Sequence, residues 1–530
     1  MYGGIVKKKI VVRIILYGAL CMFLLYAYRF RILEFINDNF YKEYKLEELD
    51  TEQKLEDFES FYSNIVESVP FLDEHTELYG IDFEERYEYY KSEILKTQNN
   101  FQYYCTLKAI GEDIPSFHTD MCFPLYSNLQ NLNCYNSKQT LLSLGQQAKI
   151  EAWTQIIEDG IKEYENVDIV DVKYVSGKYM VDDAYLAEDY QYLSGYEVVQ
   201  VDGIGVDEYV TQNISIFNLY YDYANNKPYR KYFVFNNREG NKVSVLWKNQ
   251  SGNQIELDMY VDYGAEVAFN YGDIFADEEL NDTTDSSAIV TFTDDINEVE
   301  YVEINNFDNS EGEKLKKYLK NTKYDTVIID LRNNYGGYIE YAQEYIYSAL
   351  YSEDVVQSYE WLIPDSTSNQ VVTDNWLTKI KYEFDKDENA HYYHRSIKYE
   401  GKVKNNKDVY YLVGPNTGSA ADTYISMIKE NNLGTIVGSC TGGEGLGDSF
   451  ICNSLDNSSL IYVYFPSVGY NENTGEELYS GTRPDVYVDR TAEEYSLWRS
   501  MLDEGDANTY ENRLLHDAVL KWVIENAGNK

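Results

Sequence analysis

Short apolar segments alternate with amphipathic ones from Val299 onward, and this alternation constrains the fold more than any other feature of the chain. Strands buried on both faces have near-continuous apolar sequences, and they occur mainly in sheets that helices cover. The strand candidates are VEYVEINNF, DTVIIDLR, DVYYLVG, TIVG and SLIYVYF; the helix candidates are EGEKLKKYLKN and residues 339–350 and 420–431. The pattern therefore predicts an α/β core over residues 299–490.

The segments around this core have other patterns. Residues 272–298 are rich in Asp, Thr and Ser, which indicates an acidic linker, and residues 166–271 hold short β-type runs that predict a β-rich module. Helical spacing in residues 29–98 indicates a stalk or cap, and residues 99–165 form a second helical part. Helical spacing returns in residues 491–530, where five apolar positions should pack on the core: Leu514, Leu515, Val519, Leu520 and Val523.

Near the N-terminus, residues 10–28 are apolar apart from Arg13 and are long enough to cross a bilayer core of about 30 Å as a helix. Basic residues at positions 7–9 favour a cytoplasmic tail over residues 1–9, which would place the rest of the chain outside the cytoplasm. A cleaved signal peptide is the alternative, but the apolar run ends without a small-x-small cleavage site. We therefore expect a single-pass anchor in the cell membrane.

The charge of the chain bears on its partners. Ninety acidic and 45 basic side chains give a net charge of −45, which repels nucleic acid. The excess of acid is either a solvated surface or an attraction for basic polypeptides, and composition alone does not separate the two. The cysteines have no metal-ligand spacing, so neither a metal nor another cofactor is expected.

The segment VYYLVGPNTGSAADTYISMIKENN places Ser419 where an apolar strand turns into an amphipathic helix. A serine at such a turn exposes its hydroxyl, and the first N–H groups of the helix, beginning at Ala420, can bind a developing oxyanion. The alternative is a helix N-cap, which is the commoner role of a serine before a helix. The segment DTVIIDLRNNYGGYIEYAQ similarly ends a strand in Gly336 and Gly337, which are either a left-handed turn or a second source of oxyanion donors.

Together, D-L-R-N-N-x-G-G and N-T-G-S-A-A-D resemble the motifs of the C-terminal-processing, or tail-specific, serine peptidases. T-I-V-G-S-C-T-G-G-E-G and G-T-R-P-D-V-Y-V are similar to two further motifs of that family. The resemblance implies a crotonase/ClpP-like α/β core that hydrolyses peptide bonds, in many members near C-termini. It also implies that Ser419 is the nucleophile and that polypeptides are the substrates.

One position departs from the family pattern. The Ser-Lys branch has a lysine where this chain has Glu444, and a carboxylate is too weak a base to replace it. The tricorn-core-like branch instead uses a histidine far upstream, and IPSFHTD resembles its stretch, which makes His118 the expected general base. An imidazole can accept the serine proton and return it to the leaving amine. Glu444 has no part in this expected mechanism.

The same branch implies a glutamate shortly before the closing Pro-Asp that orients the histidine, and Glu477 is preferred to Glu476. Its helper serine would precede the histidine directly, where this chain has Phe117, with Ser116 and Thr119 as substitutes. The segment YLSGYEVVQVDGIGVDEYV resembles part of a PDZ domain, and a plain β module is the alternative. The sequence thus predicts an extracytoplasmic serine endopeptidase, with an inactive binding protein of the same fold as the alternative.

Overall fold

The computed structural model describes most of the chain after residue 44. The described residues are 45–114, 116, 118–121, 134–135, 146–162, 170–181, 188–235, 242–260, 289–308, 310–375, 383–387, 389–404, 406–445, 450–475, 477, 479–491, 494 and 510–527. The tail and anchor expected at residues 1–28 lie outside them. Within the described part, no helix combines the length and apolar character needed to cross a membrane.

A six-stranded sheet forms the core, in the order β12-β13-β14-β18-β19-β23. Its strands are β12 (Val290–Asp294), β13 (Val299–Glu303), β14 (Thr326–Asp330), β18 (Asp408–Val413), β19 (Thr435–Gly438) and β23 (Val486–Tyr487). All neighbouring strands are parallel except β12, which pairs antiparallel with β13. The edge strand β12 lies inside the range expected as linker; residues 272–288 of that range lie outside the described part.

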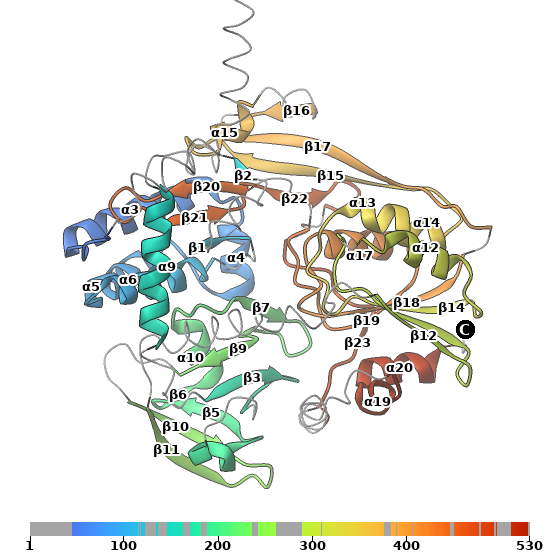
Figure 1. Ribbon diagram of the computed structural model, residues 1–530, viewed down its shortest axis with the longest axis horizontal. Helices are drawn as coiled ribbons and strands as arrows, with labels where there is room; N and C mark the ends of the chain where they lie inside the picture. The colour runs from blue at the N-terminus through green and yellow to red at the C-terminus, as the bar shows by residue number, and fades with distance from the viewer. Residues whose placement is uncertain are drawn as a thin grey trace, which may run out of the picture.

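Helices cover both faces of this sheet (Figure 1). On one face lie α12 (Gly312–Lys320), α13 (Ile339–Tyr341), a π-helical turn (Ala342–Tyr347), α14 (Ser348–Leu350) and α17 (Ala420–Glu430). On the other lie α19 (Tyr510–His516) and α20 (Ala518–Asn526), whose Val519, Leu520 and Val523 are buried against Ile328 and Leu412. Leu515 is the exception among the expected tail contacts, because it is 59% exposed.

The N-terminal helices pack against strands from the end of the chain (Figure 1). They are α3 (Thr51–Ser68), α4 (Leu72–Tyr79), α5 (Tyr87–Lys96), α6 (Asn100–Gly111) and α9 (Gln146–Lys162). Asp50 begins α3 with a capping box to Gln53. The ring of Phe61 on α3 meets the edge of Tyr462 at 5.1 Å, and the Asp57 carboxylate accepts the Ser458 N–H at 2.7 Å. These helices therefore share one apolar core with the strands of the six-stranded sheet.

Two four-stranded sheets join the N-terminal helices to the core. One has the order β1-β21-β20-β2, from β1 (Asp120–Met121), β21 (Ile461–Tyr464), β20 (Phe450–Ser454) and β2 (Cys134–Tyr135). The other has the order β16-β17-β15-β22, from β16 (Glu383–Lys386), β17 (Ala390–Tyr399), β15 (Val355–Pro364) and β22 (Val468–Asn471), with α15 (Gln370–Thr373) after β15. The segment SLIYVYF thus forms a strand, β21, but outside the central sheet in which the alternation had placed it.

The β-rich module forms a separate sheet with its own apolar core. It comprises β3 (Asp171–Val175), β4 (Lys178–Val181), a 3-10 turn (Glu188–Leu193), β5 (Glu197–Val201), β6 (Ile204–Gly205), α10 (Val206–Gln212), β9 (Tyr232–Val234), β10 (Lys242–Lys248) and β11 (Gln254–Tyr260), with the hairpin of β7 (Leu219–Asp222) and β8 (Lys227–Arg230). A buried carboxylate, that of Asp113 just after α6, accepts hydrogen bonds from Arg86 at 2.7 Å and from Arg230 of the module at 2.9 Å. This ion pair ties the module to the helices.

Candidate active site

Ser419 lies between the end of β18 and the start of α17, in the strand-to-helix turn that the sequence predicted. The turn is held by Thr417, whose N–H donates to Gly414 O at 2.8 Å and whose hydroxyl donates to Leu331 O at 2.8 Å. Ser419 itself has φ 51° and ψ −122°, which few residues other than glycine adopt. A strained serine at this kind of turn is the geometry of a nucleophile elbow.

The hydroxyl of Ser419 is not used to cap the helix. Ser419 occupies the N-cap position of α17, but its side chain makes no capping hydrogen bond. Its backbone N–H donates to Gly443 O at 2.9 Å. The side chain of Ser419, a half-buried residue, makes no hydrogen bond to any residue that the structure describes.

The glycine pair approaches the serine closely. A Cβ atom added to Gly336 would lie 2.8 Å from Ser419 Cβ and 2.9 Å from Ala420 N. The Gly336 N–H already donates to Asn334 Oδ1 at 2.9 Å, and the Asn334 carbonyl accepts the Gly418 N–H at 3.0 Å. In contrast, the N–H groups of Gly337 and Ala420 have no acceptor in the described part of the chain. Of the three residues expected to form an oxyanion hole, two therefore present free donors.

His118 contacts Glu444, not Glu477. Its Nδ1 atom forms a short contact with Glu444 Oε2, from the residue that follows Gly443. Glu444 is buried, with 4% of its surface exposed, while His118 is half-buried. Gly443 O accepts the Ser419 N–H, so Ser419 and His118 both contact the loop of residues 443–444. No hydrogen bond joins their side chains among the described residues.

Aromatic rings hold the other side of His118. It follows α6 and immediately precedes β1, whose Asp120 pairs with Val463 of β21. The imidazole stacks on Phe465 at 4.7 Å between ring centroids and lies 5.2 Å from Phe450. The Ser116 hydroxyl accepts the His118 backbone N–H at 3.2 Å, so it is turned to the main chain. With Nδ1 at a carboxylate, Nε2 is the ring nitrogen that makes no hydrogen bond within the described part of the chain.

Glu477 is connected to the pair of His118 and Glu444 through the backbone of Tyr479. Its carboxylate accepts the N–H groups of Tyr479 at 2.6 Å and Ser480 at 3.1 Å, and Tyr479 O in turn accepts the Glu444 N–H at 3.1 Å. Glu477 therefore shapes the turn that supports Glu444. Among the described residues, the carboxylate that contacts the His118 ring is that of Glu444, and no contact joins His118 to Glu477.

Asp422, on the first turn of α17, connects the same loops. Its Oδ1 accepts the Thr441 hydroxyl and the Thr482 N–H, the latter at 3.1 Å, while Oδ2 is buried without a partner in the described part. Burial, opposed by these hydrogen bonds and reinforced by the charge of Glu477, raises the pKa of Asp422 to about 6. The sequence motif contained Asp422, but only the fold shows that it joins residues 441 and 482.

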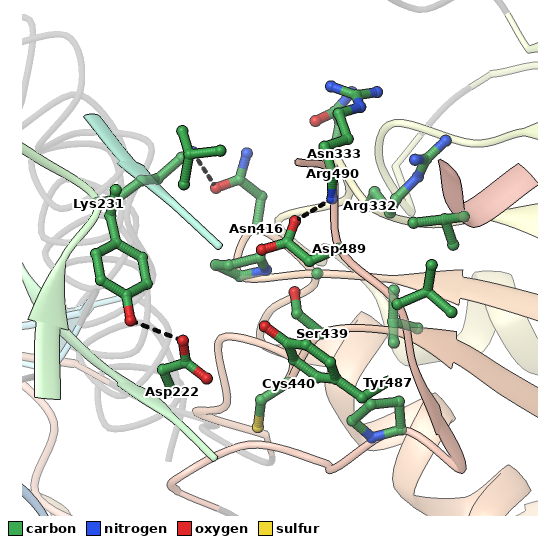
Figure 2. Close-up of a pocket in the computed structure, with 18 of the residues that line it drawn as sticks. Asp222, Lys231, Arg332, Asn333, Asn416, Ser439, Cys440, Tyr487, Asp489 and Arg490 are labelled. Atoms are coloured by element: carbon green, nitrogen blue, oxygen red, sulfur yellow. Dashed lines mark hydrogen bonds between the residues drawn. The ribbon is translucent and has the colours of Figure 1, made fainter. Parts of the chain in front are cut away.

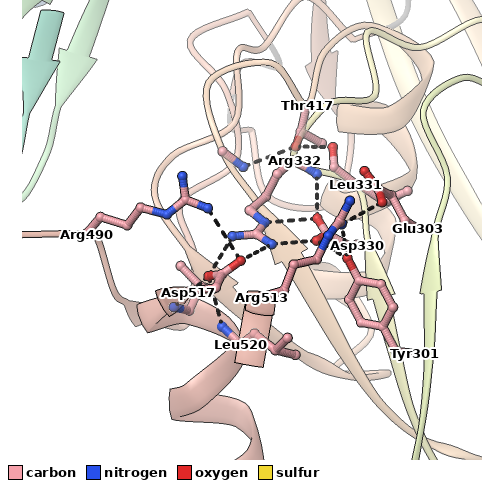
Figure 3. A network of polar contacts seen from close by, with 12 residues as sticks. Tyr301, Glu303, Asp330, Leu331, Arg332, Thr417, Arg490, Arg513, Asp517 and Leu520 are labelled. Carbon is pink, nitrogen blue, oxygen red and sulfur yellow. Dashed lines mark hydrogen bonds and ion pairs between the residues drawn. The ribbon is translucent and has the colours of Figure 1, made fainter. Parts of the chain in front are cut away.

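An ion-pair network fixes the loop before the glycine pair (Figure 3). Arg332 donates to Asp330 at 2.9 Å and to Asp517 at 2.9 Å, and Arg513 pairs with Glu303 at 2.6 Å. Burial opposes ionisation of Asp517, but the guanidinium groups of Arg332 and Arg490 outweigh it and lower the pKa of Asp517 to about 2. The arginine of the D-L-R-N-N motif thus anchors the glycine loop to the C-terminal helices.

Known proteins resemble this architecture. Residues 298–488 match peptidase family S41. No curated protein matches the chain. Among solved structures, mature CPAF is similar with a TM-score of 0.50 and 14% identity, over 90% of this chain and 98% of that one. The photosystem II D1 C-terminal processing protease (TM-score 0.32, 12% identity, 83% of this chain and 94% of that one) and tricorn protease (TM-score 0.34, 11% identity, 90% and 36%) are also similar. At such identity, the likeness to mature CPAF shows a shared fold.

Proposed function

This chain carries a domain of peptidase family S41, a family of serine-type peptidases, and we propose that it is a serine endopeptidase. In this proposal Ser419 attacks the peptide bond, His118 transfers protons and Glu444 orients His118. The observation that carries the proposal is the contact of His118 Nδ1 with Glu444, on the loop that also holds the Ser419 N–H. This geometry supports a Ser-His-Glu triad, because a carboxylate on Nδ1 leaves Nε2 able to accept a proton.

The residues of the site suit each step of acyl transfer. The Ser419 oxygen attacks the scissile carbonyl while His118 Nε2 takes the hydroxyl proton. The negative oxygen that forms is stabilised by the N–H groups of Ala420 and Gly337. His118 then protonates the leaving amine, and a water molecule hydrolyses the acyl-serine in the same way. The serine and histidine reach hydrogen-bond distance when substrate closes the site, as is common for sites without a ligand.

Glu444 acquires a role that its sequence position did not suggest. A buried carboxylate is stabilised by a positive partner, and the imidazolium that forms in the transition state is such a partner. Glu444 is therefore a positioning residue for His118, although it cannot itself be the base. Glu477 supports this arrangement indirectly, through the turn that holds the Glu444 N–H.

The substrate and the cellular site follow from other features. The apolar residues 10–28 favour a membrane anchor, with the catalytic part outside the cytoplasm. The match to peptidase family S41 supports polypeptides as substrates, and we expect cleavage near their C-termini. An inactive binding protein of the same fold is the competing function. It is favoured by the absence of a hydrogen bond between Ser419 and His118 in the described part.

Labelling and proteolysis test the proposal together. The full-length protein should react with a fluorophosphonate at Ser419 and should cleave an unfolded reporter polypeptide. Ser419→Ala should abolish both activities, and His118→Ala should slow both by at least about 10³-fold, because the base is lost. His516→Ala, on helix α19, is the control and should behave as the wild type. A folded protein that never labels would instead be a binding protein.

A further inference from the structure

A cavity of about 500 Å³ lies between the β-rich module and the catalytic sheet (Figure 2). One wall is formed by β3, by the hairpin of β7 and β8, and by residues 231–232. The opposite wall is formed by the segments that follow β14, β18 and β19, at the carboxyl ends of parallel strands. Ligands of open α/β sheets bind at this edge, and the volume is that of a typical small-ligand site.

Most of the charges in the cavity neutralise one another. Arg332 is bound by Asp330 and Asp517, Arg490 also pairs with Asp517, and Arg513 is bound by Glu303. The two other carboxylates of the lining, Asp222 and Asp489, accept hydrogen bonds from the Tyr174 hydroxyl and the Arg490 N–H, both at 2.7 Å. Such satisfied pairs have little left to offer a ligand.

Lys231 differs from these groups. Its ammonium donates to the neutral Asn416 side chain at 2.7 Å and lies 5.1 Å from the centre of the Tyr232 ring. The ammonium of Lys173, on β3, approaches the same ring to 5.1 Å. Burial, and then the charge of Lys173, lower the pKa of Lys231 to about 8. Among the described residues, no carboxylate pairs with Lys231.

An ammonium without an acid beside it is unexpected at Lys231 in a chain of net charge −45. Burial removes part of its hydration, and an anion bound at Lys231 would give the ammonium a partner of opposite charge. An ammonium also has three N–H donors, of which Asn416 uses one. We propose that this cavity is a second binding site that takes a carboxylate group of a peptide chain at Lys231, with the tyrosine rings as its walls.

The site adjoins the nucleophile. Asn416 belongs to the turn that leads to Ser419, but the backbone of that turn is held by Thr417 and Asn334. A carboxylate can therefore reach Lys231 without dismantling the turn. The inference rests on the proposed function only in naming a peptide as the ligand: an occupant at Lys231 would lie against the turn that carries the reactive serine.

Calorimetric titration of the full-length Ser419→Ala protein tests this site. The probes are acetyl-tetra-alanine with a free C-terminal carboxylate, the same peptide as an amide, and an amide in which the third residue is glutamate. At least one peptide with a carboxylate should bind about tenfold more tightly than the neutral amide, and the two acidic peptides distinguish a chain terminus from a side chain. Lys231→Met should remove that preference, and Lys231→Arg should retain it.

Asn416→Asp is the matched second variant. The new carboxylate replaces the amide that accepts the Lys231 hydrogen bond, so it neutralises the ammonium from within the protein. The preference for acidic peptides should therefore disappear while the shape of the turn is kept. Equal binding of all three peptides, or a preference that survives in folded Lys231→Met, overturns the proposal. If Lys231→Met fails to fold, the Asn416→Asp variant decides: a preference for acidic peptides that survives in that variant overturns the proposal. Because Ser419→Ala cannot cleave peptides, the outcome is independent of whether Ser419 is a nucleophile.

Discussion

Replacing Gly336 by alanine should inactivate the protein without unfolding it. Gly336 has φ +106°, and its added Cβ would lie 2.8 Å from Ser419 Cβ, 2.9 Å from Ala420 N and 2.9 Å from Gly418 O. All three atoms belong to the nucleophile turn, so none of them can yield as the end of a flexible side chain would. The alanine can be accommodated only if the glycine loop and the nucleophile turn move apart.

The size of the effect follows from these distances. Non-bonded carbon atoms prefer about 3.5–4.0 Å, so the two segments must separate by roughly 0.7–1 Å. A displacement of about 1 Å in a catalytic site can cost about 10²-fold, and the loss of one oxyanion donor about 10²–10³-fold. We therefore expect kcat/KM to fall by about 10²–10³-fold, which corresponds to about 3–4 kcal/mol of transition-state stabilisation.

Gly203→Ala is the control, because it carries the backbone strain without the clash. Gly203 has φ +78°, and its added Cβ would meet nothing within 4 Å. Both variants should lose about 1–3 kcal/mol of unfolding free energy, and only Gly336→Ala should lose activity. The measurements are kcat/KM on a reporter polypeptide and chemical unfolding. Activity of Gly336→Ala within about threefold of the wild type would refute the close approach of the two loops.

Two further predictions concern the buried charges. Arg332→Met should lower the unfolding free energy by about 3–5 kcal/mol, because Asp330 and Asp517 lose their main cation. Chemical denaturation measures this loss, with Lys323→Met, which changes an exposed lysine, as the control. A loss of stability smaller in Arg332→Met than in Lys323→Met would contradict the network. Asp422 has a pKa of about 6 in the fold against an ordinary 3.8, so its protonated form is preferred in the fold. The unfolding free energy should therefore fall by about 3 kcal/mol as the pH rises from about 4 to 6 and above, and Asp422→Asn should abolish this decrease. If the wild type and Asp422→Asn instead show the same dependence of unfolding free energy on pH, folding does not hinder the ionisation of Asp422.

The sequence located Ser419 at a strand-to-helix turn because a local pattern encodes that turn. An apolar strand, a Pro-Asn-Thr-Gly turn and an amphipathic helix determine where Ser419 lies, and the helix ends within one residue of the predicted boundary. The sequence also predicted that Gly336 and Gly337 follow a strand, and the structure brings Gly336 close to Ser419. The pattern did not predict that the Gly336 N–H donates to the Asn334 side chain, because that hydrogen bond depends on how the loop folds back.

The partner of His118 depends on tertiary structure. His118 and Glu444 are 326 positions apart, and their contact requires β1 to pair with β21 and the loop after β19 to pass beside it. A glutamate in the position matched to a lysine appeared to be a loss of function when considered alone. The strands β15 and β17 were also missed, although large apolar side chains alternate at positions 359, 361 and 363 of VVQSYEWLIP, a period-two pattern that could have predicted β15.

The most direct test of the triad compares Glu444→Gln with Glu477→Gln in kcat/KM on the same reporter polypeptide. Glutamine at position 444 keeps the size of the side chain but removes the charge and can stabilise the wrong imidazole tautomer, so activity should fall by about 10³–10⁴-fold. Glutamine at position 477 should change kcat/KM by less than about tenfold, because it keeps an oxygen for the Tyr479 N–H. The reverse order, with Glu444→Gln near wild-type activity and Glu477→Gln inactive, would contradict the assignment of Glu444 to His118.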